Sequence, residues 1–216
     1  EQVLGGNGEV ATTLLSPPQL AAVHSPEESR RLLGEAEQYP FDLAAAEAAL
    51  RASSVPEGFT AELVYPDSIP ELGLSAELLK GNLAEIGVTL ETRSVTTSEW
   101  FGTMADRVHG IGFMHYTPTT ADPAEMINWF LGPDNLASFS SADVDSALAA
   151  AREAGSPEEQ LDGLLRASAL QAEANVYAPL WWGERAFATD GSVVLDGVTS
   201  FSLFTSAWPL QLKPAA

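Results

Sequence analysis

The chain has 216 residues, 45% of them hydrophobic, which is enough for one ordinary core without metals or disulfides. It contains no cysteine, which excludes disulfides and thiolate metal sites, and no apolar run approaches the roughly 20 residues that a membrane-spanning helix needs. Its 30 acidic and 10 basic residues give a net charge of -20, and the resulting repulsion disfavours nucleic acid and anionic membranes as partners.

Two helices are predicted by one start signal, SPEE, which occurs at Ser25 to Glu28 and again at Ser156 to Glu159. In both copies serine is a favourable N-cap, proline fits the first helical position and glutamate occupies the third. The second predicted helix is the longer one. Its predicted apolar stripe consists of Leu161, Leu165, Ala169, Ala172 and Val176.

Between these helices, the chain alternates between helix and strand patterns. A helix is predicted from Asp42, a favourable N-cap, and a strand is predicted at residues 60–65. A second helix, capped by Ser75, is expected to end at Gly87 in a left-handed conformation, and the strand pattern VTLETRSV follows directly. This order is typical of a parallel sheet flanked by helices, so we expect an α/β fold.

Two further elements precede a polar loop. Thr96 to Glu99 has the spacing of a capping box before a short helix that carries Trp100 and Met104. A buried strand is predicted from Ile111, and it gives way to the threonine-rich sequence TPTTAD. Loops at the carboxyl ends of strands in open α/β sheets are where ligands usually bind.

Several short segments follow one another in a characteristic order. They are YPFDLAAAEAALRAS, VPEGF, LKGNLAEIGVTLE, the pair Glu99 and Trp100, the pair Asp122 and Pro123, Asn135, FSSADVDSALAAAREA and YAPLWW. Together they resemble the extracellular solute-binding proteins of the peptide, oligopeptide and nickel type, family five, from about Gly5 to Trp182. The resemblance implies an α/β lobe like those of type II periplasmic binding proteins, with a mainly parallel or mixed sheet flanked by helices.

The resemblance also implies a receptor rather than an enzyme. Members of the family capture a solute outside the cytoplasmic membrane and deliver it to an ATP-driven importer, so the expected partners are a small-molecule or peptide solute and an ABC permease. No cofactor is expected. The location implied is extracellular or periplasmic, with membrane anchoring through an N-terminal part.

Whole receptors of this family are much longer than this chain. We therefore expect residues 1–196 to form the C-terminal ligand-binding lobe, and residues 197–216 to form a tail that returns to a missing first lobe. Glu1 in place of methionine agrees with an excised or trimmed chain. In the family, the missing N-terminal part supplies the export signal and the opposite wall of the binding cleft.

The expected ligand-binding residues are Tyr116, Thr117, Thr119, His115 and Trp182. By the resemblance, Tyr116 takes the position of an aromatic residue in peptide-binding members. Thr119 stands where many of them have an acid that pairs with the amino terminus of a bound peptide. Because an ammonium group in a closed cleft needs an anion, Thr119 favours a neutral or differently charged solute, such as an oligosaccharide, a capped peptide or a chelate.

The histidines and tryptophans are also candidates for metal ligands or solute contacts. His24, His109 and His115 lack the spacing of metal ligands, so no metal site is expected. Trp181 and Trp182 end the predicted strand YAPLWW, where adjacent side chains face opposite sides. We therefore expect one of them in the core and the other exposed, at an interface or facing a ligand.

Two other function classes remain open. A glycosidase or other hydrolytic enzyme would need paired carboxylates, and Asp122, Glu125 and Glu184 are candidates that no context distinguishes. Neither a GxSxG nucleophile elbow nor a GxxxxGK phosphate loop occurs. A sensor or protein-interaction module is the second alternative, because the apolar tail after Ala188 has no obvious place in a self-contained lobe.

Overall fold

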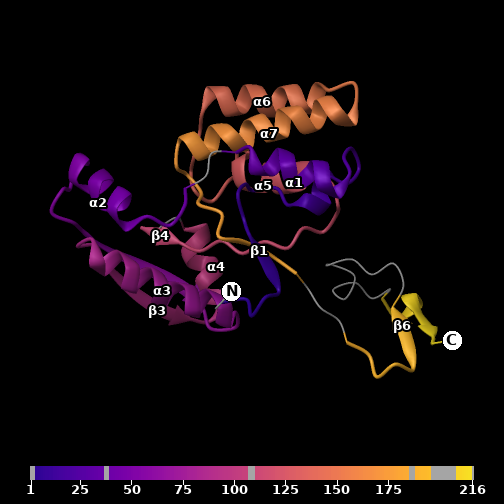
Figure 1. Cartoon of the computed structure of the whole chain (residues 1–216), viewed down its shortest axis with the longest axis horizontal. Coiled ribbons are helices and arrows are strands. Elements are labelled where there is room, and N and C mark those ends of the chain that lie inside the picture. The colour runs from indigo at the N-terminus through magenta and orange to yellow at the C-terminus, as the bar shows by residue number, and fades with distance from the viewer. Residues whose placement is uncertain (1–2, 37–38, 107–109, 185–187, 196–207, 216) are drawn as a thin grey trace. The chain divides into compact units, whose positions relative to one another are not determined.

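The computed structural model describes residues 3–36, 39–106, 110–184, 188–195 and 208–215 (Figure 1). Contacts within the chain divide it into two units, each made of two stretches. The first, which we call the sheet unit, consists of Glu1–Gly5 and Gln38–His115. The second, the helical unit, consists of Gly6–Glu37 and Tyr116–Ala216.

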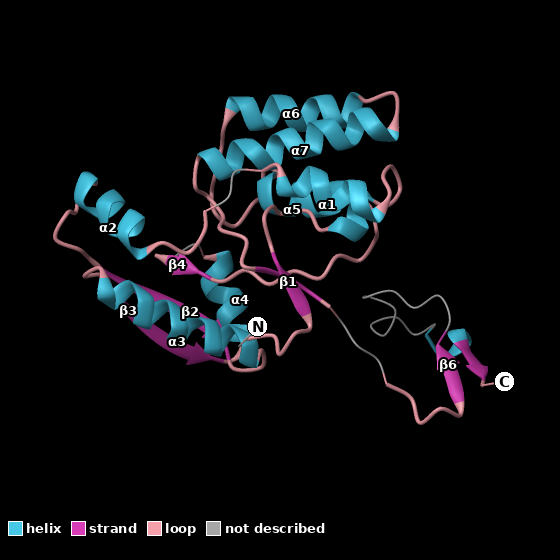
Figure 2. Ribbon diagram, viewed as in Figure 1, coloured by secondary structure: helices cyan, strands magenta, loops and turns pink. Residues whose placement is uncertain are grey.

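The sheet unit is built on three parallel strands (Figure 2). They are β2 (Thr60–Pro66), β3 (Thr89–Val95) and β4 (Ile111–Gly112), in the order β3-β2-β4. β2 pairs with β3 over its whole length and with β4 at Leu63 and Val64. The expected α/β fold with a parallel sheet is therefore confirmed.

Three helices accompany this sheet: α2 (Leu43–Ala52), α3 (Pro70–Glu85) and α4 (Thr97–Ala105). α3 packs against β2 and β3, and α4 packs against β2. The apolar side chains of α3, α4 and the strands form the core of the unit. Its buried residues include Leu63, Val64, Leu72, Ala76, Val88, Leu90, Trp100 and Met104.

Two of the predicted helix boundaries in this unit are confirmed. Asp42 accepts the Ala45 amide at 3.0 Å, and Gly87 has the expected left-handed φ of +88°. The prediction that Ser75 caps α3 is wrong. The helix begins five residues earlier at Pro70, which fits its first position, and the Ser75 hydroxyl donates to the carbonyl oxygen of Glu71 at 2.8 Å.

The helical unit contains elements from both ends of the chain. They are β1 (Gly8–Val10), the 3-10 helix η1 (Pro17–Leu20), α1 (Pro26–Gly34), α5 (Pro123–Leu131), α6 (Ala142–Glu153), α7 (Pro157–Glu173), β5 (Trp181–Gly183), β6 (Val193–Leu195), the 3-10 helix η3 (Trp208–Gln211) and β7 (Leu212–Pro214). β1 pairs with β5, and β6 pairs with β7, both antiparallel. The expected boundary at residue 196 lies outside the described residues and stays a prediction.

Helices α6 and α7 lie side by side and approach closely (Figure 1). A Cβ added at Gly163 of α7 would lie 2.9 Å from the Cβ of Ala151 in α6, so the absence of a side chain permits this contact. α7 also packs against α5, and its buried face consists of Leu161, Leu164, Ala167, Ser168 and Gln171. The predicted stripe was thus partly wrong, because Leu165 is only half-buried and Ala169 is exposed.

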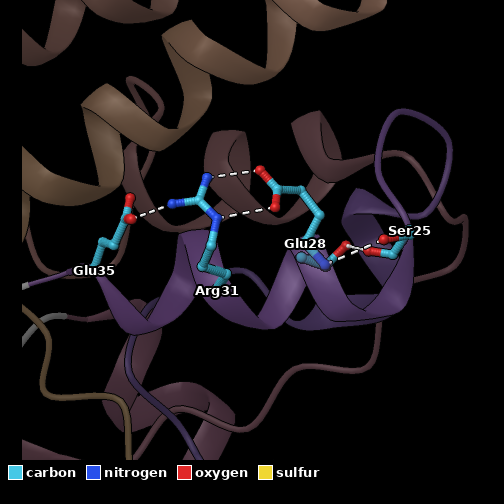
Figure 3. A network of polar contacts seen from close by, with 5 residues as sticks. Ser25, Glu28, Arg31 and Glu35 are labelled. Atoms are coloured by element: carbon cyan, nitrogen blue, oxygen red, sulfur yellow. Dashed lines mark hydrogen bonds and ion pairs between the residues drawn. The ribbon is translucent and has the colours of Figure 1, made fainter.

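The SPEE signals are confirmed at both helices. At α1, the Ser25 hydroxyl accepts the Glu28 amide at 3.2 Å, and at α7 Ser156 accepts the Glu159 amide at the same distance. Figure 3 shows how Arg31 then bridges along α1, with two hydrogen bonds to Glu28 at 2.6 and 2.9 Å and a further one to Glu35. These charged groups are exposed, so the serine cap defines the helix start more than the ion pairs do.

Candidate functional site

The loop before α5 is held by one carboxylate. Glu125, in the first turn of α5, accepts five hydrogen bonds from residues that precede the helix. Its Oε1 accepts the Tyr116 hydroxyl at 2.7 Å, the Thr119 amide at 2.7 Å and the Thr119 hydroxyl at 2.8 Å. Its Oε2 accepts the Thr120 amide at 2.8 Å and the Thr120 hydroxyl at 2.6 Å. We call Tyr116, Thr119, Thr120 and Glu125 the Glu125 clasp.

The helix start explains why this carboxylate is available. Asp122 is the N-cap of α5, and its Oδ1 accepts the Ala124 amide at 2.8 Å, while Pro123 occupies the first helical position. Glu125 is then the third helical residue, which in a capping box would bond the N-cap amide. Here the Asp122 amide donates to the Thr120 hydroxyl at 3.3 Å, so Glu125 is free to bond the loop further upstream.

The clasp holds a fixed charge. Partial burial acts to raise the pKa of Glu125, but the hydrogen bonds from Thr119, Thr120 and Tyr116 outweigh it and lower this pKa to about 2. The positive end of the α5 dipole also favours an anion in the first turn. Burial, together with the bond to Glu125, raises the pKa of Tyr116 to about 12. At neutral pH the clasp therefore consists of a carboxylate and three neutral hydroxyl groups.

An aromatic cluster adjoins the clasp. The Tyr116 ring stacks on Trp129, with centroids 4.7 Å apart and an interplanar angle of 23°. Phe130 meets the Tyr116 ring edge-on at 6.2 Å and contacts Tyr177 in the same way at 5.1 Å. Phe130 is buried, whereas Trp129 remains 45% exposed. A partly exposed aromatic side chain, that of Trp129, therefore lies beside the polar loop.

The expected site residues take different places. Tyr116 and Thr119 are brought together by Glu125, and Thr117, between them in the chain, is half-buried. His115 is exposed and is the last residue of the sheet unit. Trp182 donates its indole N–H to the carbonyl oxygen of Thr13 at 3.1 Å, which fixes its ring within the helical unit.

Some expectations about side chains need correction. Trp181 and Trp182 are both half-buried in β5, so neither is fully in the core nor fully exposed. In the sequence, Glu125 is one of 30 acidic residues, and no pattern distinguishes Trp129. The only signal for Glu125 was its place three residues after the N-cap Asp122.

Among the described residues, no group of three or more His, Cys, Asp or Glu side chains could hold a metal ion. His24 is half-buried, and His109 lies outside the described residues. In the same described ranges, no helix is both long and apolar enough to span a bilayer.

A comparison with models of protein families shows the family to which the chain belongs. Residues 1–138 match the family described as bacterial extracellular solute-binding proteins, family 5, middle part. The chain belongs to this family. A search among curated protein sequences found no significant match.

Solved structures of other bacterial proteins share the fold. HbpA2 from Haemophilus parasuis aligns with 99% of this chain, with a TM-score of 0.73 and 18% identity. The dipeptide-binding protein of Pseudoalteromonas sp. SM9913, in complex with Met-Leu, aligns with 83% of the chain at a TM-score of 0.71 and 19% identity. A periplasmic oligopeptide-binding protein from Thermotoga maritima with bound mannohexaose aligns with 90% of it at 0.69 and 13%.

These alignments confirm the α/β fold of type II periplasmic binding proteins. They cover only 36% of the Pseudoalteromonas protein and 41% of each of the other two. The solute-binding protein of family 5 described here thus spans well under half the length of these relatives.

Proposed function

We propose that this chain is the solute-contacting part of a receptor that captures a small solute for an ATP-driven importer. The observation that carries the proposal is the Glu125 clasp, a hydrogen-bonded polar loop beside the partly exposed side chain of Trp129. The clasp lies inside the stretch that matches family 5. Tyr116, Thr117 and Thr119 are the proposed primary contacts, and His115 and Trp182 are secondary ones.

The proposed function is reversible binding of a solute without chemical conversion of it. A glycosidase needs a carboxylic acid that keeps its proton near neutral pH, and the hydrogen bonds to Glu125 act in the opposite direction. Asp122 is occupied as the N-cap of α5. Neither carboxylate is therefore prepared for acid catalysis. A sensor or interaction module has no comparable supporting observation.

The proposal extends to the rest of the receptor. Because the aligned relatives are more than twice as long, we propose that a further lobe supplies the opposite wall of a cleft, and that closure of the two lobes excludes water from the solute. Residues 1–196 would form the binding lobe and residues 197–216 a tail that returns to the other lobe. The receptor would lie outside the cytoplasmic membrane, anchored through the N-terminal part, and an ABC permease in that membrane would be its partner.

A ligand screen tests this proposal. The full-length protein is mixed with dipeptides, neutral oligosaccharides and metal chelates, and thermal shifts are followed by calorimetry of each hit. A receptor should bind one class reversibly and return it unchanged, as chromatography of the recovered solute would show. Turnover of a bound solute, or no binding by any class at millimolar concentration, would contradict the proposal.

A further inference from the structure

The Glu125 clasp fixes the direction of its hydrogen bonds. An ionised carboxylate can only accept, so every hydroxyl that bonds to it must donate its single proton to it. The hydroxyl groups of Tyr116, Thr119 and Thr120 are all within 2.6–2.8 Å of a Glu125 oxygen. Each of these protons is therefore committed to the carboxylate.

What these hydroxyl groups can offer to a solute follows from this assignment. A hydroxyl that has donated its proton retains only acceptor lone pairs. The Thr120 oxygen already accepts a long hydrogen bond of 3.3 Å from the Asp122 amide, so Thr119 and Tyr116 keep the larger acceptor capacity. The amides of Thr119 and Thr120 are likewise directed to Glu125. The polar groups of the clasp thus offer acceptors to a solute.

We propose that the solute presents hydroxyl donors and no anionic group to this loop, so that the receptor is selective for a neutral polyhydroxylated solute of the saccharide class. This inference rests on the proposed function and names the chemistry of the same site. A carboxylate or phosphate brings only acceptors, which would face the lone pairs of Thr119 and Tyr116 without a proton between them.

Two further observations favour a neutral saccharide over an amine. Both Glu125 oxygens already accept hydrogen bonds, three on Oε1 and two on Oε2, so neither has a lone pair left for a direct hydrogen bond from an ammonium group. Trp129, which stacks on Tyr116 beside the loop, remains 45% exposed, and flat aromatic surfaces bind the apolar faces of sugar rings. The chain's charge of -20 adds to the repulsion of anions.

The test uses matched probes on the full-length protein. Neutral di- and hexasaccharides are compared by calorimetry with the aldonic acids obtained from them, with their amino-sugar counterparts and with dipeptides. We expect a neutral saccharide to bind at least about tenfold more tightly than its aldonic acid. Aldonic acids or amino sugars that bind as tightly as their neutral counterparts would overturn the inference.

Single substitutions in the Glu125 clasp test which hydroxyl group contacts the saccharide. Thr119→Val removes the acceptor and keeps the shape, and we expect it to weaken saccharide binding about tenfold, whereas Thr119→Ser retains the hydroxyl and should restore binding. Thr120→Val, measured alongside, should have a smaller effect because its oxygen also serves Asp122. Circular dichroism checks that each variant is folded. Equal affinity of the wild-type protein and a folded Thr119→Val variant would contradict the inference.

The proposed function and this inference fail in different ways. If only dipeptides bind, the receptor function stands and the saccharide assignment is wrong. If no probe binds at millimolar concentration, the receptor function itself fails. Quenching of tryptophan fluorescence by a bound saccharide, lost in Trp129→Phe, would assign the binding to this aromatic face. Quenching that persists in that variant would place the saccharide elsewhere and overturn the inference.

Discussion

Two hydrogen bonds join Thr120 to Glu125, from the Thr120 amide at 2.8 Å and from its hydroxyl at 2.6 Å to the same carboxylate oxygen. Because these bonds connect the loop to the first turn of α5, removal of the carboxylate should loosen both. We expect Glu125→Ala to lower the free energy of unfolding by about 1.5–3 kcal/mol, since hydrogen bonds to charged groups contribute in this range. Urea denaturation at pH 7 measures the change.

A matched control exists for this substitution. Glu158 is an exposed glutamate in the first turn of α7, next to a serine cap like that of α1. Glu158→Ala should change stability by less than about 0.5 kcal/mol. Equal effects at Glu125 and Glu158 would mean that the clasp contributes no more than any acid at a helix start.

The clasp should also be visible in the pH dependence of stability. The folded-state pKa of Glu125 lies near 2, below its ordinary value of 4.5, so its contribution is fully present above about pH 5 and is lost as the pH falls toward 2. The stability difference between the wild-type protein and Glu125→Gln should therefore shrink by about 1–2 kcal/mol over this range, after allowance for solvent screening. Denaturation curves at pH 6, 4 and 3 measure it. A difference that does not vary with pH would contradict the assignment of this pKa.

Tyr116 should contribute to solute affinity through its ring. In the full-length protein, Tyr116→Ala should weaken binding by about 1–3 kcal/mol, as expected for loss of an aromatic contact. Tyr116→Phe keeps the ring and should weaken binding less. Calorimetry with the solute found in the screen measures both, and Tyr39→Ala, at an exposed tyrosine of the sheet unit, is the control. An unchanged dissociation constant for Tyr116→Ala would remove this residue from the site.

Two serines at the N-termini of neighbouring helices allow a test of helix capping. Ser156 accepts the Glu159 amide at the start of α7, whereas Ser141, the N-cap of α6, makes no side-chain cap hydrogen bond. Ser156→Ala should cost about 1 kcal/mol, and Ser141→Ala should cost clearly less. Thermal or urea denaturation of the two variants compares them directly, and similar losses would show that the hydroxyl bond is not the source of the stabilisation.

Two glycines of the sheet unit should respond in opposite directions to alanine. Gly58 has φ +95°, and a Cβ there would lie 2.0 Å from the carbonyl oxygen of Gly87, so Gly58→Ala should cost about 3 kcal/mol or more. Gly81, inside α3, has nothing within 4 Å of its added Cβ, so Gly81→Ala should stabilise by about 0.5–1 kcal/mol. Hydrogen exchange of β2 and β3 amides reports both changes. A stable Gly58→Ala variant would mean that this backbone contact can relax.

Local signals account for the parts of the fold that could be predicted. Asp42, Thr96 and Ser156 cap helices by hydrogen bonds to residues three positions ahead, so their roles can be read from a few letters. Ser75 shows the limit of this reasoning. A serine can cap a helix or bond back within one, and the choice depended on Pro70 starting the helix earlier.

The candidate site depended on longer-range geometry. Tyr116 was predicted from its place in the loop, but its partner Glu125 is nine residues away, and the two meet only because the loop turns back over the start of α5. The face of α7 depended in the same way on its packing against both α5 and α6. Spacing alone specifies neither contact.

The indole of Trp182 reaches a carbonyl 169 residues away, at Thr13, and β1 finds its only described strand partner in β5. During synthesis β1 therefore leaves the ribosome long before β5 exists. All strands of the three-stranded sheet have been synthesised once Gly112 is reached, so they can pair with one another at that stage. The backbone hydrogen-bonding groups of β1 are then still unpaired, because β5 has not been made. The order of translation thus makes this early strand the segment of the nascent chain that most needs protection from wrong pairing.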